Sequence, residues 1–480
     1  MLNRSKIAIL ANEVLEMDWY KLAKNREEEL ITELRELLQI ESVLEQEKAT
    51  ADAPFGPGPL AALQFMLEKG RAQQMIVKNV DNMAGHIEMG EGDELLGILC
   101  HVDVVPAGDH ATWTYPPFAG EIVDGKLYAR GAIDDKGPTM AAWLAMKLVK
   151  DAGVQLNKRV RLIVGSDEES GFRCVDRYFE KEEMPTIGFA PDADFPLINA
   201  EKGIAHLVFS QKQAREEEEN LLSFASGKRI NMVPETATAV LNRASENIRL
   251  KFHEFLSENN AEGTLNLEGD RYIITVKGKS AHALEPEKGR NAAVLLAKFL
   301  TMELKAGAGA QFVQFVTHVF DGDHTGRALG FDYVDDMSGE TTLNPGLVAF
   351  GDEGGIIEVS MRYSVTYPFE EKMTGIQQQM AAQPFVLDVA GNSKPHYVPE
   401  EDELVQTLLS IYRKHTNDFS KVLSTGGGTY ARVLKKGVAF GMLYPGEPDV
   451  AHQADEYVVV ENLVKAAAIY AEAIVKLASK

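Results

Sequence analysis

The alternation of short apolar runs with helix-like segments at both ends of the chain constrains its fold most. Near the amino end, leucines recur at helical spacing behind the acidic run 27–29, which suits the positive end of a helix dipole. The next stretch predicts a strand, a helix and a second strand, over 95–100, 138–150 and 160–164. Such alternation is typical of an α/β domain with a mixed, mostly parallel sheet.

The carboxyl end again alternates helical segments with a short apolar run. A helical pattern follows Glu401, and an apolar run over 438–443 precedes a long predicted helix over 460–477. Because both ends share one architecture, we expect 1–201 and 394–480 to form a single discontinuous domain.

The middle of the chain, 202–393, has a different pattern. Its apolar residues alternate more strictly, and the runs 272–276, 312–319 and 356–365 read as strands around a few helices. We therefore predict an inserted α+β domain here. The acidic run 216–219 within it is expected to be a solvated loop.

Charge and cysteine content narrow the classes of function. The 480 residues carry 72 acidic and 49 basic side chains, a net charge of −23, and such a field repels nucleic acids and anionic membranes. Cys100 and Cys174, the two cysteines, form neither a disulfide framework nor a C-x-x-C motif. No apolar run approaches the ~20 residues of a membrane span. We expect a cytoplasmic protein with no nucleic-acid or membrane partner.

The first candidate for chemistry is His101-Val102-Asp103, directly after the apolar run 95–100. Ligands gather where the strands of an open α/β sheet end. An imidazole there can bind a metal, and Asp103 can accept the proton of its other ring nitrogen. Taken alone, such a triplet is more often a histidine satisfied by a local hydrogen bond.

Further carboxylates and a second histidine stand beside other predicted elements. Each motif alone can be a capping residue or a turn, although three consecutive acids repel one another unless they face water or a cation. The motifs are Asp134-Asp135 before a helix, Asp167-Glu168-Glu169 after a strand, Asp192 and Asp194 after another apolar run, and His452 after the run 438–443.

Together, these motifs amount to a ligand set for two metal ions. Two divalent ions ~3.5–4 Å apart need one shared carboxylate and two further nitrogen or oxygen ligands each. Two histidines and three acids meet that need and leave one glutamate over. A glutamate that does not bind the metals can serve as the general base.

The ordered motifs resemble those of a known family. Among the co-catalytic zinc metallopeptidases and amidohydrolases, which include aminoacylase, glutamate carboxypeptidase, succinyl-diaminopimelate desuccinylase and carnosinase, the likeness is greatest to the bacterial PepV-type dipeptidases. It extends from Met17 to the carboxyl end. Residues 1–16 have no counterpart in it, so Met17 is the expected initiator. The motifs that carry it are 101–106, 130–138, 166–170, 191–196 and His452.

The resemblance implies a role for each motif residue. Asp134 would bridge two metals, His101 and Asp192 would complete one site, and Glu169 and His452 the other. Glu168 would be the general base, and Asp103 would orient His101. The family also implies a cis peptide bond between Asp134 and Asp135.

For the inserted domain, the resemblance implies a lid that contacts the substrate. His282 would polarise the scissile carbonyl. Asn231, Arg362 and the backbone of Gly426, Gly427 and Gly428 would hold the terminal carboxylate of the substrate.

The function implied is a metal-dependent dipeptidase that hydrolyses short peptides with free termini. Zinc is the expected metal, although manganese or cobalt would also suit these ligands, and the long lid favours a monomer. An N-acyl amino-acid deacylase or desuccinylase would share every metal ligand. A non-catalytic metal-dependent peptide-binding protein is a further alternative, against which Glu168 argues because binding needs no general base.

Overall fold

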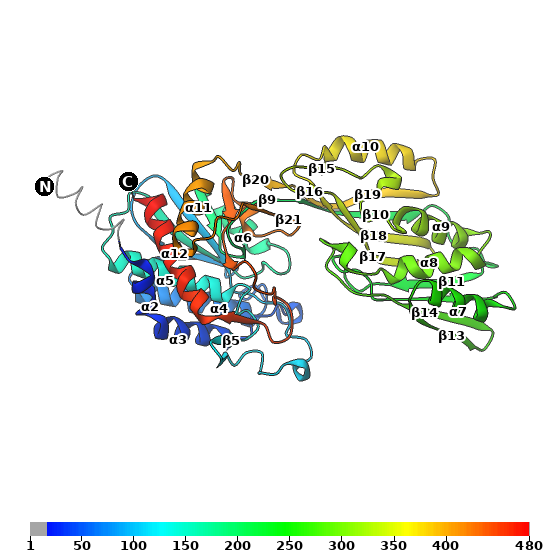
Figure 1. The fold of residues 1–480 in the computed structure, drawn as a ribbon, viewed down its shortest axis with the longest axis horizontal. Helices are drawn as coiled ribbons and strands as arrows, with labels where there is room; N and C mark the ends of the chain where they lie inside the picture. Colours follow the sequence, from blue (N-terminus) through cyan, green and yellow to red (C-terminus); the bar gives the residue numbers. More distant parts are fainter. Residues whose placement is uncertain (1–16, 480) are drawn as a thin grey trace. The chain divides into compact units, whose positions relative to one another are not determined.

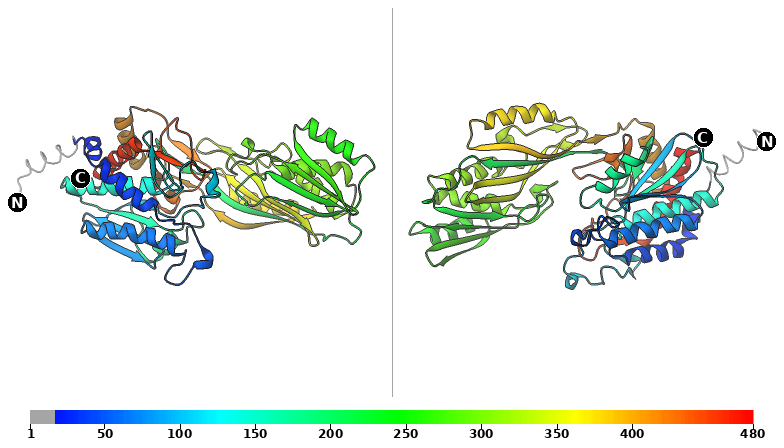
Figure 2. Two further views of the ribbon diagram at one scale, coloured as in Figure 1. Left: turned by 90° about the horizontal axis from the view of Figure 1, so that it is seen from below. Right: turned by 180° about the vertical axis from the view of Figure 1, so that it is seen from behind.

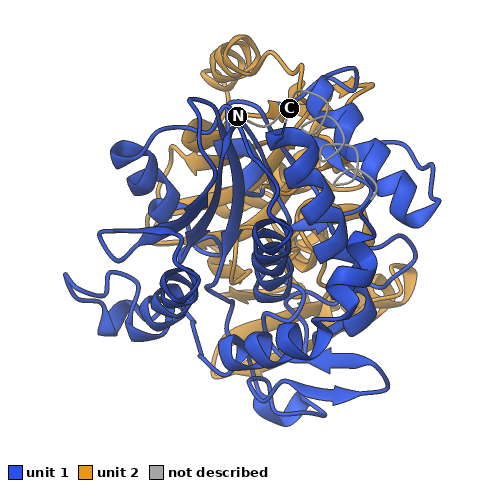
Figure 3. Ribbon diagram, turned by 90° about the vertical axis from the view of Figure 1, so that its left-hand side faces the viewer, with its two compact units in different colours: residues 1–199, 397–423, 429–480 blue, residues 200–396, 424–428 orange. Residues whose placement is uncertain are grey.

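The computed structural model describes residues 17–479, and their contacts divide into two compact units (Figure 3). The first unit contains the chain up to residue 199, then 397–423 and the chain from 429 onward; the second contains 200–396 and 424–428. Residues 1–16 lie outside the described part, so Met17 as the initiator stays a prediction. Within 17–479, none of the helices combines the length and apolar content that crossing a bilayer requires.

The first unit is built on a mixed sheet with the strand order β1-β2-β6-β3-β7-β22-β9-β20. At its centre, β3 pairs in parallel with β6 and β7, and β7 pairs in parallel with β22. The pairs β1–β2, β2–β6 and β22–β9 are antiparallel. The expected α/β class is confirmed. The strands are β1 (Ile76–Val80), β2 (Ala84–Met89), β3 (Leu95–His101), β6 (Arg159–Gly165), β7 (Ile187–Ala190), β9 (Ile198–Glu201), β20 (His396–Tyr397) and β22 (Gly437–Ala439).

Both faces of this sheet are covered, which explains the uninterrupted apolar run of β3. Leu96, Ile98 and Cys100 pack into the larger core, whereas Leu99 packs into a smaller core on the other face. The larger core takes residues from α2 (Trp19–Lys24), α3 (Glu27–Leu38), α4 (Pro57–Ala72), α5 (Lys136–Asp151), α11 (Glu403–Thr416) and α12 (Val460–Ala478). The smaller core takes residues from α6 (Arg173–Lys181) and the 3₁₀ turn η5 (Tyr430–Val433). A strand buried on both faces has no polar side to display.

Short strands outside the main path complete the first unit. The predicted run 438–443 is divided at Phe440-Gly441 into β22 and β23 (Met442–Leu443), and Gly441 has a φ of +80° that suits glycine. β23 pairs in parallel with β8 (Ala193–Asp194), and β24 (Tyr457–Val459) pairs with β5 (Lys126–Tyr128), which pairs with β4 (Glu121–Val123).

The second unit contains an antiparallel sheet with the order β13-β14-β12-β11-β17-β18-β10-β19 (Figures 1 and 2). Its strands are β10 (Gly203–Gln211), β11 (Leu221–Ser226), β12 (Thr236–Leu241), β13 (Glu262–Glu268), β14 (Arg271–Lys277), β17 (Thr342–Gly351), β18 (Gly354–Tyr363) and β19 (Phe385–Ser393). Alternate residues of β10 are buried, and they share one core with α7 (Ile248–Glu258), α8 (Ala292–Glu303), α9 (Ala308–Phe320) and α10 (Phe369–Met380). β15 (Val334–Asp335) pairs with β16 (Gly339–Glu340), and β21 (Leu423–Thr425) pairs with β9.

One prediction for the inserted segment is wrong, and a second holds only in part. The run 312–319 belongs to helix α9, where Phe312, Phe315, Val316 and Val319 are buried; their spacing of three and four is that of a helix face. In the acidic run, 216–218 are exposed, but Glu219 is 6% exposed. Its Oε1 accepts the N–H of Asn220, so that end of the run is part of the fold rather than a solvated loop.

Candidate metal centre

The predicted ligands come from loops at one edge of the first unit's sheet. His101 is the last residue of β3, the segment containing Glu168 and Glu169 follows β6, and Asp192 follows β7. These three strands are parallel, so their carboxyl ends meet at the same edge. Asp134 lies just before α5, and His452 lies between β23 and β24.

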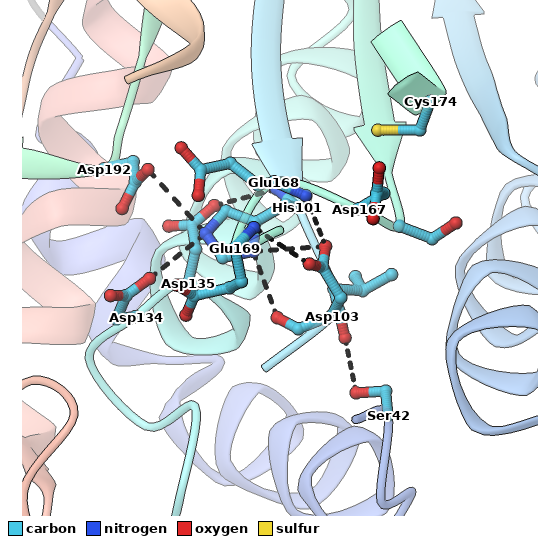
Figure 4. Close-up of polar contacts among 12 residues, drawn as sticks. Ser42, His101, Asp103, Asp134, Asp135, Asp167, Glu168, Glu169, Cys174 and Asp192 are labelled. Atoms are coloured by element: carbon cyan, nitrogen blue, oxygen red, sulfur yellow. Dashed lines mark hydrogen bonds and ion pairs between the residues drawn. The ribbon is translucent and has the colours of Figure 1, made fainter. Parts of the chain in front are cut away.

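At this edge the side chains form two groups with the spacing of metal ligands. In the first, His101 Nε2 lies 3.1 Å from Asp134 Oδ1 and 3.7 Å from Asp192 Oδ2 (Figure 4). In the second, His452 Nε2 lies 3.0 Å from Asp134 Oδ2 and 3.1 Å from Glu169 Oε2. Within each group the ligand atoms lie within 4.8 Å of one another, and Asp134 belongs to both.

The orientation of His101 is fixed by backbone groups. Its Nδ1 lies 3.0 Å from the carbonyl oxygen of Asp103 and 3.5 Å from that residue's Oδ1, so the carbonyl is the nearer acceptor. Donation from Nδ1 leaves Nε2 to face the carboxylates. The Asp103 carboxylate has a second contact that the sequence did not indicate, because Oδ1 and Oδ2 accept the N–H groups of Glu168 and Glu169, each at 3.1 Å.

The loop before α5 presents Asp134 and turns Asp135 away from the two groups. The peptide bond between them is cis, as the family resemblance implied. Asp135 Oδ2 accepts the N–H of His101 at 3.1 Å and the hydroxyl of Thr139 at 3.2 Å. Asp135 therefore supports the loop.

Charge balance favours cations at these groups. Burial raises the pKa of Asp192 well above its ordinary value, and the negative charge of Asp134 adds to the effect. Burial also raises the pKa of Glu169, again with a contribution from Asp134. Burial opposes protonation of His452, but its contacts with Asp134 and Glu169 raise its pKa to about 11. Imidazole and carboxylate donors crowded in this way fit divalent metal ions.

Glu168 stands beside the groups and belongs to neither. Burial raises the pKa of its carboxyl well above the usual value, the charge of His101 lowers it, and the neighbouring acids Asp192, Glu169 and Asp134 raise it. A carboxyl group in such surroundings is poised for proton transfer.

The predicted substrate contacts all lie in the second unit. Asn231 and His282 occupy adjacent segments, since Met232 and His282 form an antiparallel bridge and the N–H of Ala283 donates to the Asn231 carbonyl at 2.9 Å. The His282 imidazole is exposed, and its Nδ1 accepts the N–H of Leu284 at 3.2 Å.

Arg362 and the glycine segment meet in the same unit. Arg362 Nη1 donates to the Gly426 carbonyl at 3.1 Å, and the N–H of Gly427 donates to Thr425 Oγ1 at 2.9 Å. Lys202 N–H donates to the Thr425 carbonyl at 2.9 Å. The sequence assigned 424–428 to the first domain, whereas these bonds place the segment in the second unit.

Comparison with known proteins identifies the family. The model of peptidase family M20/M25/M40 matches residues 97–476. The chain belongs to peptidase family M20/M25/M40. This M20 peptidase is 47% identical over 467 residues to "Putative dipeptidase YtjP" of Bacillus subtilis (strain 168), covering 96% of this chain and 100% of that protein. It is 40% identical over 466 residues to "Putative dipeptidase" of Staphylococcus epidermidis (strain ATCC 12228 / FDA PCI 1200), covering 96% and 99%.

Solved structures share the fold of this M20 peptidase. Human carnosine dipeptidase 1 matches with a TM-score of 0.54 and 14% identity, over 96% of this chain and 99% of that one. The dipeptidase Dug1p of Saccharomyces cerevisiae matches with a TM-score of 0.55 and 12% identity, over 95% and 98%. The chain is thus a peptidase enzyme with candidate metal-ligand groups at the edge of its α/β sheet.

The sequence reasoning missed Glu456, a fully buried acid in contact with the Asp134 loop. Its Oε1 accepts the N–H groups of Ile133 and Asp134, at 3.0 and 3.3 Å. The available signal was its place four residues after His452, just before a short strand. Among 72 acidic residues, that position alone does not mark a buried one.

Proposed function

We propose that this M20 peptidase is a metal-dependent dipeptidase that hydrolyses short peptides with free termini. The observation that carries the proposal is the division of Asp134: its two oxygens face different histidines, each within a separate ligand group. A carboxylate divided in this way suits a bridge between two cations. The names of the 47% and 40% identical relatives support the choice of a dipeptidase.

We assign His101, Asp134 and Asp192 to one cation and Asp134, Glu169 and His452 to the other. When bound, two divalent cations supply Lewis acidity toward the peptide carbonyl and toward a water molecule. We favour zinc, with manganese or cobalt as alternatives that these nitrogen and oxygen donors also suit.

Glu168 is the proposed general base. Its carboxylate accepts a proton as the oxygen of a water molecule forms a bond to the amide carbon, and it then gives that proton to the departing amine nitrogen as the C–N bond breaks. The hydrogen bond from the Glu168 N–H to Asp103 holds this segment in place, so we assign Asp103 a positioning role for Glu168 as well as for His101.

His282 is the proposed donor to the developing oxyanion. Because its Nδ1 accepts a hydrogen bond from Leu284, the neutral ring carries its proton on Nε2. The ring is therefore prepared to donate a hydrogen bond from Nε2, which is what oxyanion stabilisation requires.

A carboxylate clamp in the second unit accounts for a preference for free carboxyl termini. Arg362 is 6% exposed, and a guanidinium can bind a carboxylate through two parallel hydrogen bonds. We propose that Arg362, Asn231 and the backbone of Gly426 and Gly427 bind this end of the substrate. The second unit, 202–393 in the sequence prediction, would then act as a lid on the catalytic domain. A monomeric state and a cytoplasmic location stay predictions from the sequence.

A hydrolysis panel tests the proposal. Chelator-treated protein is supplied with zinc, manganese or cobalt and assayed with free dipeptides, tripeptides, N-acetyl amino acids and N-succinyl amino acids. We expect metal-dependent hydrolysis that is fastest on free dipeptides. Faster cleavage of the acylated amino acids would favour the deacylase alternative. Binding of dipeptides without hydrolysis under any metal would favour the non-catalytic alternative.

A further inference from the structure

The two loops that present Asp134 and His452 are tied together by one buried side chain, that of Glu456. Glu456 has no exposed surface, and Arg130 is 2% exposed. Arg130 Nη1 donates to Glu456 Oε2 in an ion pair. The other carboxylate oxygen, Oε1, accepts the N–H groups of Ile133 and Asp134. One carboxylate thus holds the Asp134 loop at both its beginning and its end.

The backbone of Glu456 adds a third link between the loops. Its carbonyl accepts the N–H of Ala129 at 3.0 Å, and the following residue, Tyr457, begins β24, which pairs with β5 just before Ala129. Glu456 lies four residues after His452, and both His452 and Asp455 have positive φ, +63° and +57°. The turn from His452 to Glu456 is therefore short and tightly specified.

Contacts behind the ion pair hold Arg130 in place. Its Cζ lies 5.3 Å from the centroid of the Trp113 ring, and its N–H donates to the Pro117 carbonyl at 2.7 Å. Next to Trp113, Thr114 donates from its N–H and its hydroxyl to the Asp455 carboxylate, at 2.7 and 2.8 Å. The segment 113–117 therefore contacts both Arg130 and Asp455, which lies next to Glu456.

We infer that Glu456, paired with Arg130, is a positioning residue that fixes the bridging Asp134 relative to His452 and thereby sets the affinity of the metal centre. The inference rests on the metal ligands proposed above. Residues that orient metal ligands from behind change metal affinity by ~10–100-fold when they are replaced. Here the effect should extend to both cations, because Asp134 belongs to both ligand groups.

The variant Glu456→Gln tests the ion pair with Arg130 while nearly preserving the size of the side chain. Glutamine has nearly the same shape, and its amide oxygen can still accept the N–H groups of Ile133 and Asp134. Its NH₂ group would instead oppose Arg130 Nη1, a second donor, which leaves a buried guanidinium without its carboxylate. We expect the loop to shift while the fold remains.

Glu472→Gln provides a matched control. Glu472 is also a buried glutamate, 3% exposed, and it pairs with Lys414 and His415 between α11 and α12. Its partners Lys414 and His415 lie outside the metal-ligand loops. A general loss of packing or charge in the first unit would affect both variants alike.

The experiment is a zinc titration of the chelator-treated full-length chain in competition with a chromophoric chelator, together with the melting temperature of the metal-free protein. We expect Glu456→Gln to weaken binding of both ions at least tenfold, with Glu472→Gln within threefold of wild type. Wild-type affinity in Glu456→Gln, or an equal loss in Glu472→Gln, would overturn the inference. A wild-type chain that binds no zinc, manganese or cobalt would instead overturn the proposed function.

If Glu456→Gln does not fold, two variants of Arg130 test the same ion pair. Arg130→Lys keeps a cation opposite Glu456, whereas Arg130→Met removes it. We expect the lysine variant to bind zinc at least fivefold more tightly than the methionine variant. Equal affinities in these two variants would show that the ion pair does not position the ligands.

Discussion

His452 Nε2 lies 3.0 Å from Oδ2 of Asp134, the carboxylate oxygen opposite the one that faces His101. The loops that carry Asp134 and His452 are far apart in sequence. The Asp134 side chain nevertheless belongs to both ligand groups. If the carboxylate bridges two cations, the two histidines belong to different metal sites, and removing either histidine should empty only its own site.

Replacing either histidine alone should remove one metal ion and leave the other bound. In His452→Ala, the group His101, Asp134 and Asp192 remains complete, and in His101→Ala the group Asp134, Glu169 and His452 remains complete. We expect each variant to retain about one ion per chain at metal concentrations that fill wild type, and to lose most activity. Metal analysis by mass spectrometry after gel filtration measures this. Full occupancy by two ions in either variant would show that the histidine is not a ligand.

Loss of the proposed general base should separate chemistry from metal binding. We expect Glu168→Ala to keep its metal content while kcat falls by ~10²–10⁴, the range for loss of general-base catalysis. Glu180→Gln on α6, where Glu180 pairs with Arg177, is the surface control and should retain wild-type kcat. Loss of metal in Glu168→Ala would make Glu168 a ligand and contradict the assigned role.

His282 in the second unit should act on the rate and leave the metals in place. His282→Ala is expected to lower kcat/KM by ~10²–10³, as for removal of an oxyanion-hole donor, with unchanged metal content and melting temperature. His318→Ala, on the exposed side of α9, is the control within the same unit. Activity of His282→Ala within threefold of wild type would exclude His282 from the mechanism.

A buried histidine outside the site should make stability depend on pH. His86 on β2 is 3% exposed, and its Nδ1 lies 2.7 Å from the hydroxyl of Tyr178 on α6. Burial, together with the charges of Arg161 and Lys78, lowers its pKa to about 3, and the charge of Glu183 acts in the opposite direction. The unfolded chain binds this proton near pH 6.5, so between these values it carries more protons than the native state.

Because the unfolded chain binds more protons in this range, the stability of the native state depends on pH. Stability falls as the pH is lowered from about 6.5 toward 3, by up to about 1.4 kcal/mol per pH unit. We expect His86→Gln to reduce the fall in melting temperature between pH 7 and pH 5 by ~2–4 °C in metal-free protein. His318→Gln is the matched control. Parallel pH profiles for wild type and His86→Gln would contradict the prediction.

The parts of the fold that were predictable follow from local pattern. The strand ending at His101 was visible because both sheet faces are covered, which makes every residue of β3 buried. Helix α9 was missed because its apolar residues are dense enough to resemble an alternating run, although Phe312, Phe315, Val316 and Val319 carry the helical period. The burial of Glu219 depends on packing against the distant Gly307, which local sequence does not record.

Some features of the candidate site could likewise be predicted from sequence, and others depend on tertiary packing. Four of the five proposed ligands follow predicted strands, so their convergence could be expected from the rule that parallel strands end at one edge. Asp134 precedes a predicted helix, and its place beside them does not follow from that rule. The contacts of Asp103 with the N–H groups of Glu168 and Glu169 depend on how two loops meet. The burial of Glu456 against Arg130 likewise arises from tertiary packing of segments that are distant in sequence.

The number of metal ions bound by wild type and by Asp134→Asn tests whether one carboxylate serves two cations. Chelator-treated protein is saturated with zinc, freed of excess by gel filtration and analysed for metal per chain, with Asp402→Asn at the start of α11 as the control. We expect about two ions in wild type and in Asp402→Asn, and loss of both in Asp134→Asn, because one carboxylate serves both sites. Two ions retained in Asp134→Asn, or a single ion in wild type, would contradict it.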